Sequence, residues 1–197
     1  QRIDGKKWGL WAALLAGVLT ASDAHALTPA DIAALRSGET VVRIIADEGP
    51  GGRVEAAIDI AAPIERVWRV MLDCARAPSF VPKLEACRVL ETALDGSSDV
   101  REHRLRFIPL LPLLTLRFRS FYQVEREIRF VREGGDLSVM EGVWRFEPID
   151  EGRATRLHYD VRLATRFPLP RGMVRDGLAR DAPNVLRAVR EEVLRGG

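Results

Sequence analysis

Alternating apolar and polar residues recur through most of the chain and predict a protein built mainly of half-buried strands. The alternation is clearest in residues 53–60, where valine, alanine or isoleucine occupies every second position. Further strands are predicted over residues 41–45, 87–90, 100–108, 113–125, 128–131, 137–146 and 155–163. Short turns containing glycine or aspartate separate the later strands, which favours antiparallel pairing between them.

Three segments are predicted to be helical. Thr28 and Pro29 open a short helix that Gly38 ends, and a second helix begins at Pro63. A third covers residues 171–194. Its apolar residues recur every three or four positions and form a stripe of Val174, Leu178, Ala182, Val185, Val189 and Val193. Pro183 lies within this stripe, so either the helix kinks there or a second helix begins.

The element order is strand, helix, several antiparallel strands and a long amphipathic helix, which predicts the α+β fold class. A sheet with that many strands must curl, and its apolar concave face needs a cover that the last helix can supply. We expect the sheet and this helix to enclose either a packed core or a deep apolar hollow that holds a ligand.

Residues 1–26 follow the order of a secretory signal peptide. Lys6 and Lys7 precede an apolar run, and Ala24-His25-Ala26 follows it. The run is about a dozen residues long, short of the roughly 20 that a spanning helix needs; a loose membrane anchor is the alternative. We expect cleavage near Ala26 and a secreted or periplasmic protein, with residues 27–197 forming one domain that has a helical lead-in at 27–40.

Composition places the chain among ordinary globular proteins. It has 197 residues, of which 47% are hydrophobic and 29% are charged, and its formal net charge is +2. Removing residues 1–26 takes away three basic and two acidic residues, which leaves 27 basic against 26 acidic. This near balance argues against nucleic-acid binding. The three histidines are too scattered for a metal site, and we expect neither a metal nor a cofactor.

Cys74 and Cys87 are the two cysteines of the chain. In an exported protein they are expected to form a disulfide, which would close a loop of about a dozen residues and contribute roughly 2–3 kcal/mol. Two buried free thiols are the alternative. A catalytic cysteine is not expected, because no histidine lies near either residue in the sequence.

Four motifs together point to a known family. They are the segment 54–73 with Ala61-Ala62-Pro63 and Val67-Trp68, the run Phe80-Val81-Pro82 ahead of residues 87–91, the strand Glu141–Phe146, and Phe167-Pro168-Leu169-Pro170. In their order and spacing they resemble the START-like (SRPBCC) superfamily of polyketide cyclases and dehydrases, and within it the coenzyme-Q-binding branch. The resemblance covers about residues 41–195. It implies a helix-grip fold, in which a curled antiparallel sheet wraps a long C-terminal helix.

The resemblance also implies an apolar ligand, such as a lipid, a sterol or hopanoid, a quinone or a polyketide, in a cavity under the C-terminal helix. Such families include both carriers and enzymes, so the fold alone does not choose. We predict an exported, non-enzymatic carrier. One alternative is a cyclase or dehydratase acting on a polyketide-like substrate in the same cavity, and another is a protein-interaction module with a filled core.

The predicted ligand-binding residues are those whose position on a strand or helix faces the interior. They are His103, Leu105, Phe107, Leu116, Phe118, Tyr122, Met140, Trp144, Phe146, Leu157, Tyr159, Val174, Leu178 and Val185. For each of them a place in the plain core is the competing interpretation. In the enzyme alternative His103 and Tyr122 are the catalytic residues, which requires their side chains to converge in one pocket.

Residues 107–114 form a nearly uncharged apolar run that contains Pro109 and Pro112. Because proline does not sit in a central strand, the middle of this run is predicted to be a loop. An exposed apolar loop would make transient contact with a membrane, helped by four flanking arginines. These are Arg104, Arg106, Arg117 and Arg119. The alternative is that the loop packs inward on the last helix.

Overall fold

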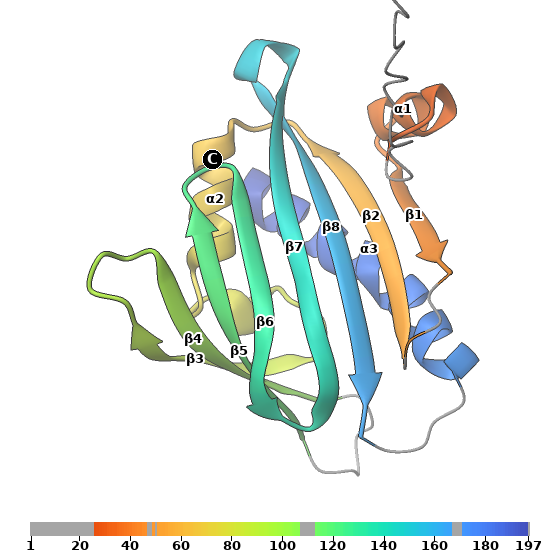
Figure 1. Cartoon of the computed structure of the whole chain (residues 1–197). Coiled ribbons are helices and arrows are strands. Elements are labelled where there is room, and N and C mark those ends of the chain that lie inside the picture. Colours follow the sequence, from red (N-terminus) through yellow and green to blue (C-terminus); the bar gives the residue numbers. More distant parts are fainter. Residues whose placement is uncertain (1–25, 47–48, 50, 107–112, 167–170, 197) are drawn as a thin grey trace, which may run out of the picture.

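Figure 1 shows a computed structural model of the chain, which describes residues 26–46, 49, 51–106, 113–166 and 171–196. Within these ranges one antiparallel sheet of eight strands forms a layer, and the helices α2 (Ile64–Leu72) and α3 (Arg171–Arg195) lie against one side of it. We call the side that carries these helices the inner face and the opposite side the outer face. This is the helix-grip fold that the sequence predicts.

The strands pair in the order β1-β2-β8-β7-β6-β5-β4-β3. Their bounds are β1 (Thr40–Ile45), β2 (Gly52–Ile60), β3 (Leu84–Thr92), β4 (Ser98–Leu105), β5 (Leu114–Gln123), β6 (Glu127–Gly135), β7 (Leu137–Ile149) and β8 (Ala154–Thr165). The chain leaves β2 through α2 and the short helix η1 (Ala77–Ser79) and reaches the far edge at β3. Consecutive antiparallel strands then fill the sheet back to β2, which pairs with β8.

The observed elements follow the predicted order, and the differences lie at their ends. β4 stops at Leu105, and Leu114 is already the first residue of β5, where it packs against the core. β6 continues to Gly135, beyond the predicted end at Val131. Gly134 and Gly135 pair with β5 after a register shift. The sequence has no apolar alternation at these positions, so the pattern does not predict this part of the strand. α3 is one helix that passes through Pro183, which settles the alternative of two helices.

The core fills the space between the inner face and the two helices. Ile58, Leu157 and Leu186 are among its fully buried side chains, each contributing about 1.5–3 kcal/mol relative to exposure. α3 buries Leu186, whereas the predicted stripe placed Val185 at this turn; Val185 is half-buried and outside the cluster. Both residues fit helical spacing after Ala182, so periodicity alone does not decide between them.

The N-terminal lead-in docks on the edge of the sheet. The helix α1 (Pro29–Arg36) begins after Thr28, whose hydroxyl accepts a hydrogen bond from the Asp31 amide, as the capping pattern predicts. Arg43 on β1 pairs with Asp31 and donates to the carbonyl of Ala26 at 3.0 Å. None of the described helices is long and apolar enough to span a membrane. Residues 1–25 and 107–112 lie outside the described residues, so export and membrane contact stay predictions.

A disulfide joins Cys74, just after α2, to Cys87 on β3. We expect a Cys74→Ala/Cys87→Ala variant to lose about 2–3 kcal/mol of unfolding free energy, because the unfolded chain regains the freedom of the closed loop. Urea unfolding with and without dithiothreitol measures the effect. The reductant should shift the wild-type midpoint and leave the double variant unmoved. Equal midpoints for wild type and variant would contradict a stabilising role.

Candidate functional site

Five ring side chains form a continuous row across the inner face. Trp144 on β7 stacks on Tyr159 on β8 with ring centroids 3.7 Å apart. Tyr159 lies 6.4 Å from Phe130 on β6, which lies 6.0 Å from Phe118 on β5. Phe118 meets His103 on β4 at 4.8 Å. We call these five residues the aromatic row. It connects the middle of the sheet with strands near the β3 edge.

A glycine makes room for the centre of this row. Gly142 on β7 is the register partner of Phe130 on β6. A β-carbon at Gly142 would lie 2.5 Å from the Phe130 ring and 2.4 Å from the carbonyl oxygen of Asp160, both impossible contacts. The Phe130 ring can therefore lie against β7 only because position 142 has no side chain.

The aromatic row is only partly covered. Phe118 and Phe130 are buried, whereas Trp144, Tyr159 and His103 are half-buried. The helix α3 packs mainly on β2 and β1, and α2 packs on α3, β7 and β8. Other half-buried apolar side chains on the same face pack beside the row, namely Leu105, Leu114, Met140 and Leu163. The inner face thus presents a partly exposed apolar surface that extends beyond the helices.

His103 forms the polar end of the row. Its ring stands edge-on to Phe118 at an interplanar angle of 89°. Burial, together with the nearby positive charge of Arg101, lowers the pKa of His103 to about 4. The imidazole is therefore neutral at physiological pH. Its Nε2 atom is buried and has no hydrogen-bond partner among the described residues.

The same strand carries a buried ion pair between Arg101 and Asp99, with an N–O distance of 2.9 Å. The remaining guanidinium nitrogens of Arg101 donate to the carbonyls of Met71 at 3.4 Å and Leu72 at 3.2 Å, and to the Tyr122 hydroxyl at 3.0 Å. These carbonyls belong to the last turn of α2, where the helix dipole favours a cation. Arg101 thus fastens α2 to the inner face.

Tyr122 and His103 do not converge. His103 is the register partner of Leu116, and Tyr122 lies six residues further along β5, which is roughly 20 Å at strand spacing. The Phe118 ring and Arg101 lie on the inner face between them. Burial raises the pKa of the Tyr122 hydroxyl above its ordinary value, which makes it a weaker acid. The acid–base pair of the enzyme alternative therefore lacks the geometry that it needs.

The structure brings most of the predicted ligand-binding residues to one surface. In the core are Leu116, Phe118, Phe146 and Leu157, and half-buried against it are Leu105, Tyr122, Met140, Trp144, Tyr159 and Leu178. Val174 and Val185 are half-buried on α3 outside this cluster, and Phe107 lies outside the described residues. Phe130, Arg101 and Asp99 also lie on this face and are not among the predicted residues. Alternation with Ile128 and with His103 gives all three an inward position.

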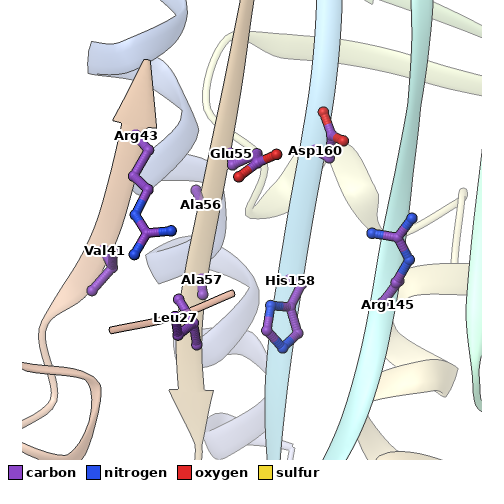
Figure 2. A pocket seen from close by; sticks show the side chains of 9 residues that line it. All are labelled: Leu27, Val41, Arg43, Glu55, Ala56, Ala57, Arg145, His158 and Asp160. Atoms are coloured by element: carbon purple, nitrogen blue, oxygen red, sulfur yellow. The ribbon is translucent and has the colours of Figure 1, made fainter. Parts of the chain in front are cut away.

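In the described part of the chain the outer face carries two depressions. Figure 2 shows a cleft between the N-terminal lead-in and the sheet, lined by Leu27, Val41, Arg43, Glu55, Ala56, Ala57, Arg145, His158 and Asp160. Its volume of about 50 Å³ suits a few water molecules rather than a small-molecule ligand. A neighbouring depression holds the ion pairs Arg53–Asp160 at 2.6 Å and Arg162–Glu141 at 3.4 Å. This depression is larger, about 380 Å³, but four of its six lining residues are charged, which does not suit an apolar ligand.

Known proteins share this sequence pattern and fold. The profile of the family described as polyketide cyclase/dehydrase and lipid transport matches residues 60–190. A Streptomyces cyaneus protein named "Putative polyketide cyclase" is 26% identical over 148 residues, which is 72% of this chain and 93% of that protein.

Two solved structures are similar to the present one. The Zhui aromatase/cyclase from Streptomyces sp. R1128 is 21% identical, with 79% of this chain and 95% of that chain covered and a TM-score of 0.62. The STAR-related lipid transfer protein from Xanthomonas axonopodis is 15% identical, with 78% and 93% covered and a TM-score of 0.66. At these identities the likeness shows the fold alone. The coenzyme-Q-binding branch stays a prediction.

Proposed function

Because the chain belongs to the polyketide cyclase/dehydrase and lipid transport family, we propose that it is an exported carrier for an apolar ligand held against the inner face of its sheet. The observation that carries this proposal is the aromatic row, whose two ends stay half-buried after α2 and α3 have packed. Covering such a surface with an apolar ligand contributes about 25 cal/mol per Å² removed from water.

The polar groups of the inner face favour a carrier over an enzyme. Arg101 and Asp99 neutralise each other, and the hydrogen bonds of Arg101 hold α2 in place. His103 and Tyr122 are too far apart to exchange protons with one reacting group. Two similar proteins are named as cyclases, so a cyclase or dehydratase is the second candidate function. Turnover of a polyketide-like substrate by the purified protein would support it.

A ligand-bound population is the first expected result. Native mass spectrometry of gently purified protein should detect an additional mass from a bound apolar molecule. Adding a total lipid extract to delipidated protein should raise its melting temperature, because a ligand that binds only the folded state stabilises it. Empty protein in the spectrum, combined with no thermal shift, would contradict the carrier proposal.

A Trp144→Ala substitution should weaken binding of that molecule about tenfold, since an aromatic contact contributes on the order of 1 kcal/mol beyond its buried area. Phe121→Ala is the matched control, because Phe121 is an exposed ring on β5 with the opposite strand parity to Phe118. Titration of both variants, followed by tryptophan fluorescence or mass spectrometry, measures the difference. Equal losses for the two variants would place the ligand elsewhere.

A further inference from the structure

The inner face also limits the chemistry of the ligand. Resting on the proposed function, we propose that the ligand carries an uncharged hydroxyl or carbonyl group at its buried end and that this group forms a hydrogen bond with Nε2 of His103. The apolar body of the ligand then lies along the aromatic row, which ends at this imidazole.

One polar atom at the end of the aromatic row, Nε2 of His103, is unsatisfied within the described part of the chain. Buried polar atoms in folded proteins are nearly always hydrogen-bonded, because an unpaired one costs about 1–3 kcal/mol. Nε2 of His103 is buried without such a partner among the described residues. Its described neighbours supply none. Phe118 against the ring and Leu116 across the register on β5 are apolar, and Cys87 across the register on β3 has no S–H group because it forms the disulfide with Cys74. A ligand oxygen at this position would remove the cost.

The charges around the imidazole favour an uncharged ligand group. Two arginines share the inner face near the imidazole, Arg132 on β6, which is the register partner of Phe118, and Arg101 on β4. Arg132 donates to the carbonyls of Leu137 at 2.6 Å and Gly135 at 3.4 Å. The charge of Arg101 is balanced by Asp99 at 2.9 Å. The remaining nitrogens of Arg101 donate to Met71, Leu72 and Tyr122, so they are committed to holding α2. A carboxylate or phosphate buried beside the neutral imidazole would lose its hydration, and the adjacent Arg101 is already paired with Asp99. An uncharged hydroxyl or carbonyl group loses far less hydration free energy on burial.

Three naphthalenes of nearly equal size test whether the site prefers an uncharged hydroxyl group, no polar group or a carboxylate. Isothermal titration at pH 7 would compare 2-naphthol, 2-methylnaphthalene and 2-naphthoate on the wild-type protein and on His103→Leu. We expect 2-naphthol to bind the wild type about tenfold more tightly than the variant, the usual value of one buried hydrogen bond. Binding of 2-methylnaphthalene should differ less than twofold between the proteins, and 2-naphthoate should bind the wild type at least tenfold more weakly than 2-naphthol.

A direct measurement on the wild type guards against a variant that does not fold. In long-range ¹H–¹⁵N spectra, the Nε2 resonance of His103 should shift when 2-naphthol is added and stay in place with 2-methylnaphthalene. A tighter complex with 2-naphthoate, or an unmoved Nε2 resonance with bound 2-naphthol, would overturn the inference. So would a failure of 2-naphthol to bind at all. The native mass spectrum tests the carrier proposal separately. If it detects a bound apolar molecule, the protein is still a carrier even where the hydrogen bond to His103 is contradicted.

Discussion

Replacing Arg101 with methionine should lower the free energy of unfolding by about 3–5 kcal/mol, the usual cost of removing one partner of a buried ion pair. The substitution leaves the Asp99 carboxylate in the interior, where it is 6% exposed, without its counter-ion. It also takes the donors away from the carbonyls of Met71 and Leu72 and from the Tyr122 hydroxyl. Urea unfolding followed by circular dichroism measures the loss.

Arg117→Met is the matched control for this experiment. Arg117 on β5 pairs with Glu102 on β4 at 3.0 Å, but on the outer face and with half of its side chain exposed. Breaking an exposed pair costs about 1 kcal/mol or less. A double variant, Asp99→Leu/Arg101→Met, should recover much of the loss because it leaves no charge buried. Equal costs for Arg101→Met and Arg117→Met would contradict the buried pair.

The Arg101 substitution should also weaken ligand retention, because Arg101 positions α2. Trp68 on α2 packs edge-on against Tyr122 at 6.1 Å and Phe146 at 5.2 Å. Trp68 and Phe146 belong to the core, and Tyr122 packs against it. A helix released from its carbonyl contacts would shift them.

The strand pattern predicts the inner face well because a strand has a period of two residues. Leu116, Phe118 and Leu157 are buried, as their alternation with polar residues requires. Strand parity also predicts that Glu102 lies on the opposite face from His103, and there Glu102 pairs with Arg117. The enclosed hollow itself stays a prediction, since alternation says which side chains face inward and not how closely the opposite layer approaches.

The polar part of the site could not be predicted from residue types. Aspartate and arginine are rarely buried, so the residue types at positions 99 and 101 do not indicate an interior place, although both positions share the parity of His103. They are buried because they pair with each other and because Arg101 meets carbonyls 29 and 30 residues earlier in the chain. Contacts of that separation depend on how α2 crosses the sheet, which no local pattern contains.

Acid should destabilise the folded protein through His103. The folded state holds the pKa of this histidine at about 4, against an ordinary value of 6.5 in the unfolded chain. Between these two values the unfolded state binds a proton that the folded state does not, so stability falls as the pH falls from 6.5 towards 4. The loss attributable to His103 should be about 3 kcal/mol over this window and should not grow further below pH 4.

The comparison of variants isolates this contribution. Carboxylates whose pKa is lowered in the fold also lose stability in acid, among them Asp31, Glu85 and Asp95. They are common to all variants, so the difference between wild type and His103→Gln reports the imidazole alone. His158→Gln, on the outer face beside Glu147, should keep the full loss due to His103. If the wild type and His103→Gln unfold with the same pH dependence between 4 and 6.5, the imidazole is accessible to protons in the folded state. The buried, neutral end of the aromatic row would then not exist in solution.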